Sequence, residues 1–245
     1  MNFAQNLKEK FLDNYNMVSG VLRSMRGDPQ AWEASIRRFE VREHLNPSPA
    51  DAILFTGSSS ITFWSSLAQD MAPLPVLNHG FGGSRMSAVV HYAGRIALPW
   101  HPRAIVLFAG TNDIADPKPA TAQQVFEGYL AFVDAIRAIL PGTPIYYISI
   151  TPTPLRWKYW PVVREANHLI QAHTHTNPAL HFIDIAGAFL GPDGLPDRRL
   201  FRYDRLHPNA RGYEKWTALI KPVLLADLFP NSESVVTTSV ALLQR

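Results

Sequence analysis

The stretch ILFTGSSSITFW, residues 53–64, decides how the rest of the sequence is interpreted. A strand-like apolar run ends at Gly57, three serines follow, and a stretch of helical character comes next. A strand-to-helix turn of this kind presents a hydroxyl at the edge of a sheet, where a helix N-terminus favours negative charge. Serine is also a preferred helix N-cap, so the stretch alone leaves a reactive hydroxyl and a capping residue both open. The nucleophile elbow G-x-S-x-G is excluded, because Ile61 stands where its second glycine belongs.

Short apolar runs alternate with longer amphipathic stretches over most of the chain. The strand candidates are residues 52–56, 76–77, 104–109, 145–150 and 182–185. The helix candidates are residues 61–69, 84–98, 122–140, 162–173 and 210–229. Because the strand candidates are continuously apolar, they are expected to be buried on both faces. The alternation predicts an α/β fold in which a five-stranded parallel sheet lies between two layers of helices.

The chain is predicted to form a single domain over residues 1–229. No Gly/Ser-rich linker divides residues 50–229, and residues 1–50 are predicted to be an N-terminal helical extension packed on the domain. That extension could brace the domain, form a lid or supply an oligomer contact. The sequence therefore does not decide whether the protein is a homo-oligomer. Residues 230–245 show no helix face and are expected to be a C-terminal tail.

Composition excludes several classes of protein. Hydrophobic residues make up 47% and charged residues 18%, which fits a globular chain with a substantial core. The net charge is only +3 with no basic block, which argues against nucleic-acid binding. The absence of cysteine excludes disulfides, thiol nucleophiles and thiolate metal sites. No apolar run reaches the roughly 18 residues of a membrane span, and no signal core is visible, so a cytoplasmic protein is the default expectation. A chain trimmed of a signal peptide would look the same.

Three further segments carry side chains suited to chemistry. NHGFGGS, residues 78–84, has glycines that let a backbone N–H approach a ligand. GTND, residues 110–113, could place an amide N–H over the same site. DRLHPN, residues 204–209, spaces a carboxylate and an imidazole so that the first can fix the tautomer of the second. Each segment alone fits an ordinary turn, but together they supply the nucleophile, base and anion stabiliser that acyl transfer requires.

Taken in order, these four segments resemble the blocks of the SGNH hydrolases, also called the GDSL esterase/lipase family. The resemblance covers about residues 52–229 and implies a flavodoxin-like three-layer fold, ester hydrolysis, and no metal or other cofactor. Carried over by position, it implies catalytic roles for Ser59, Asp204 and His207. It likewise implies an oxyanion hole formed by Ser59, Gly83 and Asn112.

Two positions depart from the family pattern. Ser58 stands where the family usually has Asp, which suggests a subgroup with a G-S-S-S-I start. Arg205 stands where glycine is frequent, which could affect access to the site. The sequence thus predicts a serine ester hydrolase acting on a small-molecule or carbohydrate acyl ester. An acyltransferase using the same acyl-enzyme, and a non-catalytic binding domain on the same fold, are the alternatives.

Residues beside these blocks could contact the substrate. Trp157, Tyr159 and Trp160 follow the fourth strand candidate and could wall an acyl or sugar pocket, or equally pack on a neighbouring loop. Arg85 could meet an anionic substrate, although a solvated helix residue is the plainer interpretation. His173 and His175 are interpreted as a solvated helix end rather than a metal pair, since no third ligand lies near them in sequence.

Overall fold

A five-stranded parallel sheet forms the centre of the computed structural model, which describes residues 12, 15–16, 18–23, 28, 30–115 and 117–230. The strand order is β2-β1-β3-β4-β5, the flavodoxin-like arrangement predicted from the sequence. The strands are β1 Ile53–Gly57, β2 Val76–Gly80, β3 Ala104–Phe108, β4 Ile145–Ile148 and β5 Leu180–Ile183. The sequence predicted all five of these strands and their parallel pairing.

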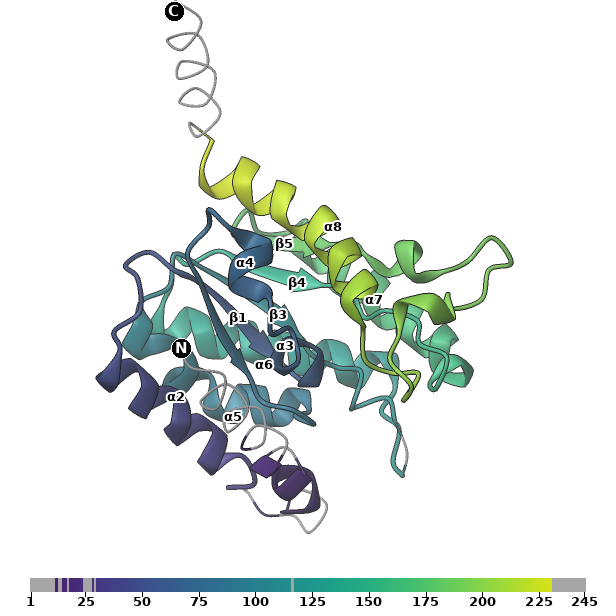
Figure 1. Cartoon of the computed structure of the whole chain (residues 1–245), viewed down its shortest axis with the longest axis horizontal. Helices are drawn as coiled ribbons and strands as arrows, with labels where there is room; N and C mark the ends of the chain where they lie inside the picture. Colours follow the sequence, from purple (N-terminus) through teal and green to yellow (C-terminus); the bar gives the residue numbers. More distant parts are fainter. Residues whose placement is uncertain are drawn as a thin grey trace, which may run out of the picture.

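Helices cover both faces of the sheet, which confirms the three-layer α/β fold (Figure 1). One core joins the sheet to α5 Met86–Ala97, α6 Ala122–Ile139 and α7 Trp160–Thr174. The other core lies under α3 Ser59–Thr62, α4 Leu67–Met71 and α8 Ala210–Leu228. Alternate residues of β1 point to opposite cores: Leu54 into the first, Ile53 and Phe55 into the second. Both faces of the central strands are therefore buried, as their continuous apolar sequences indicate.

Most elements differ from the sequence-based ranges by one or two residues, and the largest differences are in β2 and in the helix expected after β1. Strand β2 continues to Gly80, because residues 78–80 pair in register with residues 55–57 of β1. His79 therefore lies in a strand, where burial lowers its pKa to about 4. The helix expected over residues 61–69 is instead two short helices, α3 and α4, separated by a turn in which the Trp64 N–H bonds the carbonyl of Ile61.

The N-terminal extension packs on the first core through α2 Glu33–Leu45. Ile36 and Phe39 are buried among the residues of that core. Glu33 and Glu40 form ion pairs of 2.7 Å and 2.8 Å with Arg95 of α5. Part of the predicted extension, and residues 231–245 of the predicted tail, lie outside the described residues. Of the helices in the described part of the chain, none has the length and apolar character needed to cross a membrane.

Candidate active site

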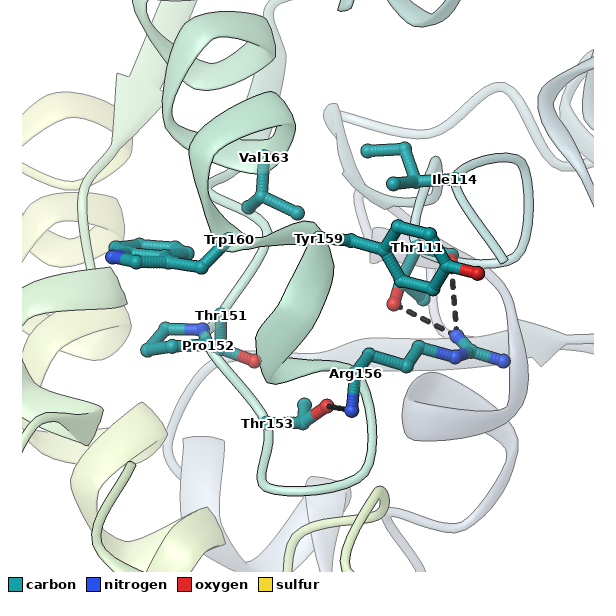
Figure 2. A pocket seen from close by; sticks show the side chains of 9 residues that line it. All are labelled: Thr111, Ile114, Thr151, Pro152, Thr153, Arg156, Tyr159, Trp160 and Val163. Carbon is teal, nitrogen blue, oxygen red and sulfur yellow. Dashed lines mark hydrogen bonds between the residues drawn. The ribbon is translucent and has the colours of Figure 1, made fainter. Parts of the chain in front are cut away.

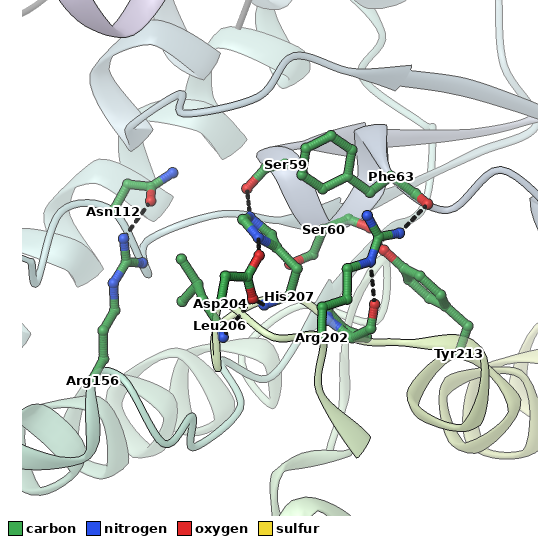
Figure 3. A network of polar contacts seen from close by, with 11 residues as sticks. Ser59, Ser60, Phe63, Asn112, Arg156, Arg202, Asp204, Leu206, His207 and Tyr213 are labelled. Carbon is green, nitrogen blue, oxygen red and sulfur yellow. Dashed lines mark hydrogen bonds and ion pairs between the residues drawn. The ribbon is translucent and has the colours of Figure 1, made fainter. Parts of the chain in front are cut away.

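Ser59, His207 and Asp204 form a chain of hydrogen bonds beyond the carboxyl ends of the strands (Figure 3). Ser59 Oγ lies 2.7 Å from His207 Nε2, and His207 Nδ1 lies 2.6 Å from Asp204 Oδ2. Asp204 Oδ1 accepts the backbone N–H groups of Leu206 and His207 at 2.9 Å and 3.0 Å. The carboxylate thus favours the tautomer with hydrogen on Nδ1, which leaves Nε2 to accept the Ser59 proton.

The turn after β1 positions Ser59. Gly57 has a φ of +127°, and a Cβ at that position would lie 2.0 Å from the carbonyl oxygen of Phe108, so a side chain there would collide with β3. The Ser58 N–H donates to the same Phe108 oxygen at 3.0 Å, which anchors the turn to the sheet. Ser59 is the first residue of α3, and its N–H donates to no acceptor among the described residues. That N–H is available to a ligand beside the Ser59 hydroxyl.

The loop that carries His207 is held at both ends. The Arg202 N–H donates to the His207 carbonyl at 2.8 Å. Asn209 caps α8 by accepting the Gly212 N–H at 3.2 Å. Arg205 has a φ of +58°, a left-handed backbone conformation that glycine adopts more readily than other residues. The Phe63 ring packs edge-on against the His207 imidazole, with centroids 4.8 Å apart.

The segments that contain Gly83 and Asn112 are bonded to each other. The Asn112 Nδ2 donates to the Ser84 carbonyl at 2.9 Å, and the Asp113 carboxylate accepts the Met86 N–H at 3.1 Å. The glycine-rich segment also reaches the turn before Ser59, because the Phe81 N–H donates to the Gly57 carbonyl at 2.9 Å. The structure therefore connects all the sequence-predicted blocks around one site. Gly83 has a φ of +79°, and within the described residues its N–H has no protein acceptor.

The pKa values of the pair suit proton transfer near neutral pH. Burial lowers the pKa of His207, and the charges of Arg202 and Arg156 act in the same direction, against the raising effect of Asp204. Burial alone would raise the pKa of Asp204, but its hydrogen bonds, led by that from the His207 side chain, hold the pKa below its ordinary value. Asp204 is therefore ionised and His207 is largely neutral, the state in which an imidazole can accept a proton.

Two adjoining pockets open at the site. The first is a small pocket lined by Ser59, Ser60, Phe108, Thr111, Thr151, Thr153, Arg156, Leu206 and His207. The second is a small pocket lined by Thr111, Ile114, Thr151, Pro152, Thr153, Arg156, Tyr159, Trp160 and Val163 (Figure 2). The two pockets share four lining residues, and this pair of pockets is the hollow beside the Ser59 hydroxyl.

The predicted substrate residues divide between the second pocket and its surroundings. Tyr159 and Trp160 line it, whereas Trp157 is not among its lining residues and stacks on Trp160 with ring centroids 6.1 Å apart. Arg85 is the N-cap residue of α5 and lines neither pocket. Arg156, Thr151 and Thr153 had no assigned role in the sequence-based prediction, although all three lie between the end of β4 and the predicted substrate residues.

His173 does not lie at a solvated helix end as expected from the sequence. Its ring packs edge-on against Phe126 and Tyr129, with centroid distances of 5.8 Å and 5.7 Å. His175, two residues on, is exposed. The helix face that carries His173 turns toward α6, so this histidine belongs to the packing between two helices.

A flavodoxin-like sheet that gathers a serine, a glycine and an asparagine from three strand-end segments, and a histidine from the loop before the last helix, defines the architecture of the GDSL-like, or SGNH, hydrolases. The sequence matches the GDSL-like Lipase/Acylhydrolase family over residues 25–215, and the chain belongs to that family.

Known proteins resemble this chain in sequence and in fold. The platelet-activating factor acetylhydrolase IB subunit alpha2 of Gallus gallus is 27% identical over 203 residues, which cover 78% of this chain and 82% of that protein. A protein of Streptococcus pneumonia, provisionally named a platelet activating factor, superposes with a TM-score of 0.70 at 18% identity, covering 89% of this chain and 99% of its own. A carbohydrate esterase family 3 structure from Talaromyces cellulolyticus gives a TM-score of 0.58 at 17% identity, covering 74% and 99%. The two structures establish likeness of fold alone.

Proposed function

We propose that this protein is a serine carboxylic ester hydrolase that cleaves short acyl esters through an acyl-enzyme. The observation that carries the proposal is the chain from Ser59 Oγ to His207 Nε2 and from His207 Nδ1 to Asp204, with separations of 2.7 Å and 2.6 Å. A nucleophile, a base within hydrogen-bond reach and a group that orients the base are the parts that nucleophilic catalysis requires. This arrangement also argues against a non-catalytic binding domain.

In the proposed reaction, His207 Nε2 takes the Ser59 proton as Oγ attacks the ester carbonyl carbon. The carbonyl π electrons move onto oxygen, and the N–H groups of Ser59, Gly83 and Asn112 stabilise the resulting negative charge. When the carbonyl re-forms, the bond to the alcohol breaks and His207 protonates the departing oxygen. Water deprotonated by His207 then attacks the acyl-enzyme and releases the acid and the free serine. Asp204 stays ionised throughout.

The shape of the hollow supports a small acyl group. The pocket at Ser59 and His207 is small and is lined mainly by short side chains together with Phe108 and Leu206. We place the alcohol part of the ester on the side of the second pocket, where Tyr159 and Trp160 supply the aromatic lining that is common in ligand sites. The name of the chicken relative, an acetylhydrolase, and that of the fungal structure, a carbohydrate esterase, agree with this choice. An alcohol held in the second pocket could also replace water, which would give acyl transfer.

We also propose that the G-S-S-S-I start marks a subgroup of the family. Ser58 is fully buried, and its hydroxyl has no hydrogen-bond partner among the described residues. A carboxylate at that position would need partners to offset the cost of its burial. Serine avoids that cost, which offers a physical reason for the departure from the family's usual Asp.

Replacing Ser59 by alanine tests the proposed function. We expect S59A to lose p-nitrophenyl acetate hydrolysis and labelling by a serine-directed phosphonate, with an unchanged melting temperature. The matched control is S66A, which removes a hydroxyl that bonds Asp70 at the start of α4 and should keep both activities. Wild-type turnover in S59A would overturn the assignment.

A screen of substrates tests the proposed acyl group. Esters of increasing chain length, assayed beside acetylated sugars, should show turnover falling beyond the shortest acyl groups. Added alcohols should reveal any acyl transfer.

A further inference from the structure

Two amide groups that the proposed mechanism uses as donors are each bound through their oxygen atom. The carbonyl of Gly82 belongs to the same peptide unit as the Gly83 N–H, and it accepts the indole N–H of Trp32 at 3.1 Å. The side-chain oxygen of Asn112 accepts a guanidinium N–H of Arg156 at 3.0 Å. In a trans peptide the C=O and N–H bonds point in opposite directions. A donor that holds the oxygen of an amide therefore also fixes where its N–H points.

Trp32 is itself held rigidly. It is only 5% exposed, and its ring meets the edge of Phe81 with centroids 6.3 Å apart. Gly20 lies against its other side, where an added Cβ would come within 2.9 Å of the indole. Trp32 immediately precedes α2, so it belongs to the N-terminal extension rather than to the four family blocks. The extension thus reaches the glycine-rich segment of the site through one buried hydrogen bond.

Arg156, which lines both pockets, holds the Asn112 amide (Figure 3). One of its terminal nitrogens donates to the carbonyl and the hydroxyl of Thr111 at 2.8 Å and 2.9 Å, and the other donates to Asn112. These three bonds fix the guanidinium plane and assign the Asn112 oxygen to the Arg156 side. A charge-assisted bond to that oxygen also polarises the amide, which strengthens its N–H groups as donors. One N–H of Asn112 bonds the Ser84 carbonyl, which leaves the second for the oxyanion.

We propose that Trp32 and Arg156 are positioning residues of the oxyanion hole, Trp32 acting through the Gly83 N–H and Arg156 through the Asn112 amide. This inference rests on the proposed function. Loss of one oxyanion donor typically lowers kcat by about 10²–10³-fold, and misaligning a donor that is still present costs less. We therefore expect each positioning variant to lower kcat by about 10- to 100-fold with KM changed less than about threefold.

The variants W32F and R156M test the proposal in the full chain. The matched control for the first is W100F, which removes an indole N–H bonded to Glu43 of the same extension at 2.7 Å. The matched control for the second is R137M, which removes a guanidinium bonded to backbone carbonyls, among them Thr143 at 2.6 Å. Both controls should keep the wild-type kcat. Because W32F also leaves a cavity, a benzothienylalanine at position 32 supplies a second variant that keeps the ring shape and lacks the donor.

Two readouts separate positioning from general damage. A trifluoromethyl ketone forms a tetrahedral adduct with a catalytic serine, and its inhibition constant should rise in parallel with the loss of kcat/KM in W32F and R156M. In double variants, R156M should cause little further loss once N112A is present, because it acts through that amide. W32F should keep its full effect in the N112A background, since it acts on a different amide. R156K should recover part of the lost kcat.

Several results would overturn the inference while leaving the proposed function intact. In the first, S59A is inactive, but W32F and R156M have the same kcat as their controls. Another is equal loss in W100F and R137M, which would show general destabilisation. A third is an R156M protein with normal kcat whose KM rises only for the anionic ester p-nitrophenyl hemisuccinate, which would make Arg156 a substrate-binding residue. Turnover retained in S59A would instead refute the proposed function itself.

Discussion

The pKa of His207 is shifted in opposite directions by one nearby carboxylate and by two nearby cations. Asp204 raises its pKa, whereas burial, which is the largest effect, and the charges of Arg202 and Arg156 lower it. The guanidinium of Arg202 lies over the Phe63 ring, 4.9 Å from its centroid, and donates to the Pro208 carbonyl at 3.1 Å. Phe63 in turn contacts the imidazole, so a cation is fixed beside the base without bonding to it. The lowered pKa of His207 favours the neutral imidazole, which is the form that accepts a proton.

The pH dependence of turnover follows from this arrangement. Because the neutral imidazole is the active form, kcat/KM should rise with pH through the pKa of His207, with a midpoint below the ordinary value of about 6.5. R202M removes a cation that opposes protonation, so the midpoint should move to higher pH. R202K keeps the charge and should keep the wild-type midpoint. A midpoint for R202M equal to or below that of R202K, measured by initial rates from pH 4 to pH 9, would contradict this account.

At the scale of single elements, the cap of α8 serves both the helix and the His207 loop. Asn209 accepts the Gly212 N–H at 3.2 Å and donates to the carbonyls of Arg199 and Phe201 at 2.9 Å and 3.0 Å. A second cap, far along the chain, serves a helix alone: Thr121 and Gln124 form a capping box at the start of α6. The two caps allow a comparison between an element that positions the site and one that does not.

Replacing the two caps should separate stability from activity. T121A should lower the free energy of unfolding by about 1 kcal/mol and leave kcat unchanged, since it removes one capping bond from α6. N209A should lower the free energy of unfolding by about 2 kcal/mol and also reduce kcat, because the His207 loop loses two further bonds. Urea denaturation and initial rates measure the two quantities. Equal kcat values for the two variants would show that the loop does not depend on Asn209.

Some of these elements can be predicted from local sequence, whereas others depend on contacts that form only in the folded chain. Strands β1, β3 and β4 were predictable because each contains an unbroken run of apolar residues. The first three site blocks were predictable because each follows a strand candidate, whereas residues 204–209 precede the last helix candidate. The end of β2 at Gly80 was not, since Asn78 and His79 read as polar and only pairing with β1 makes them a strand. Arg156 was missed for a similar reason, because its bond to Asn112 joins residues 44 positions apart that only the folded sheet edge brings together.

On the scale of the whole molecule, the N-terminal extension shares a core with the sheet. Phe39 of α2 is 5% exposed and stacks on His79 of β2, with ring centroids 4.5 Å apart and planes inclined by 11°. Trp100, which follows α5, meets the same histidine edge-on at 4.4 Å. An α2 helix that merely covered the domain would not need a buried partner within the sheet. The single-domain prediction therefore leads to a test of cooperativity.

F39A should weaken the entire fold in one step. Removing a buried phenylalanine typically costs about 3–5 kcal/mol, and if the extension and the sheet form one unit, that loss should shift a single unfolding transition. The control is V41A on the same helix, where the side chain is 56% exposed and little change is expected. Tryptophan fluorescence and far-UV circular dichroism should report coincident midpoints in both variants. If F39A instead unfolds in two steps, with the extension lost before the sheet, the extension is a separate unit. In that case the hydrogen bond from Trp32 to Gly82 could break while the hydrogen bonds among Ser59, His207 and Asp204 remain.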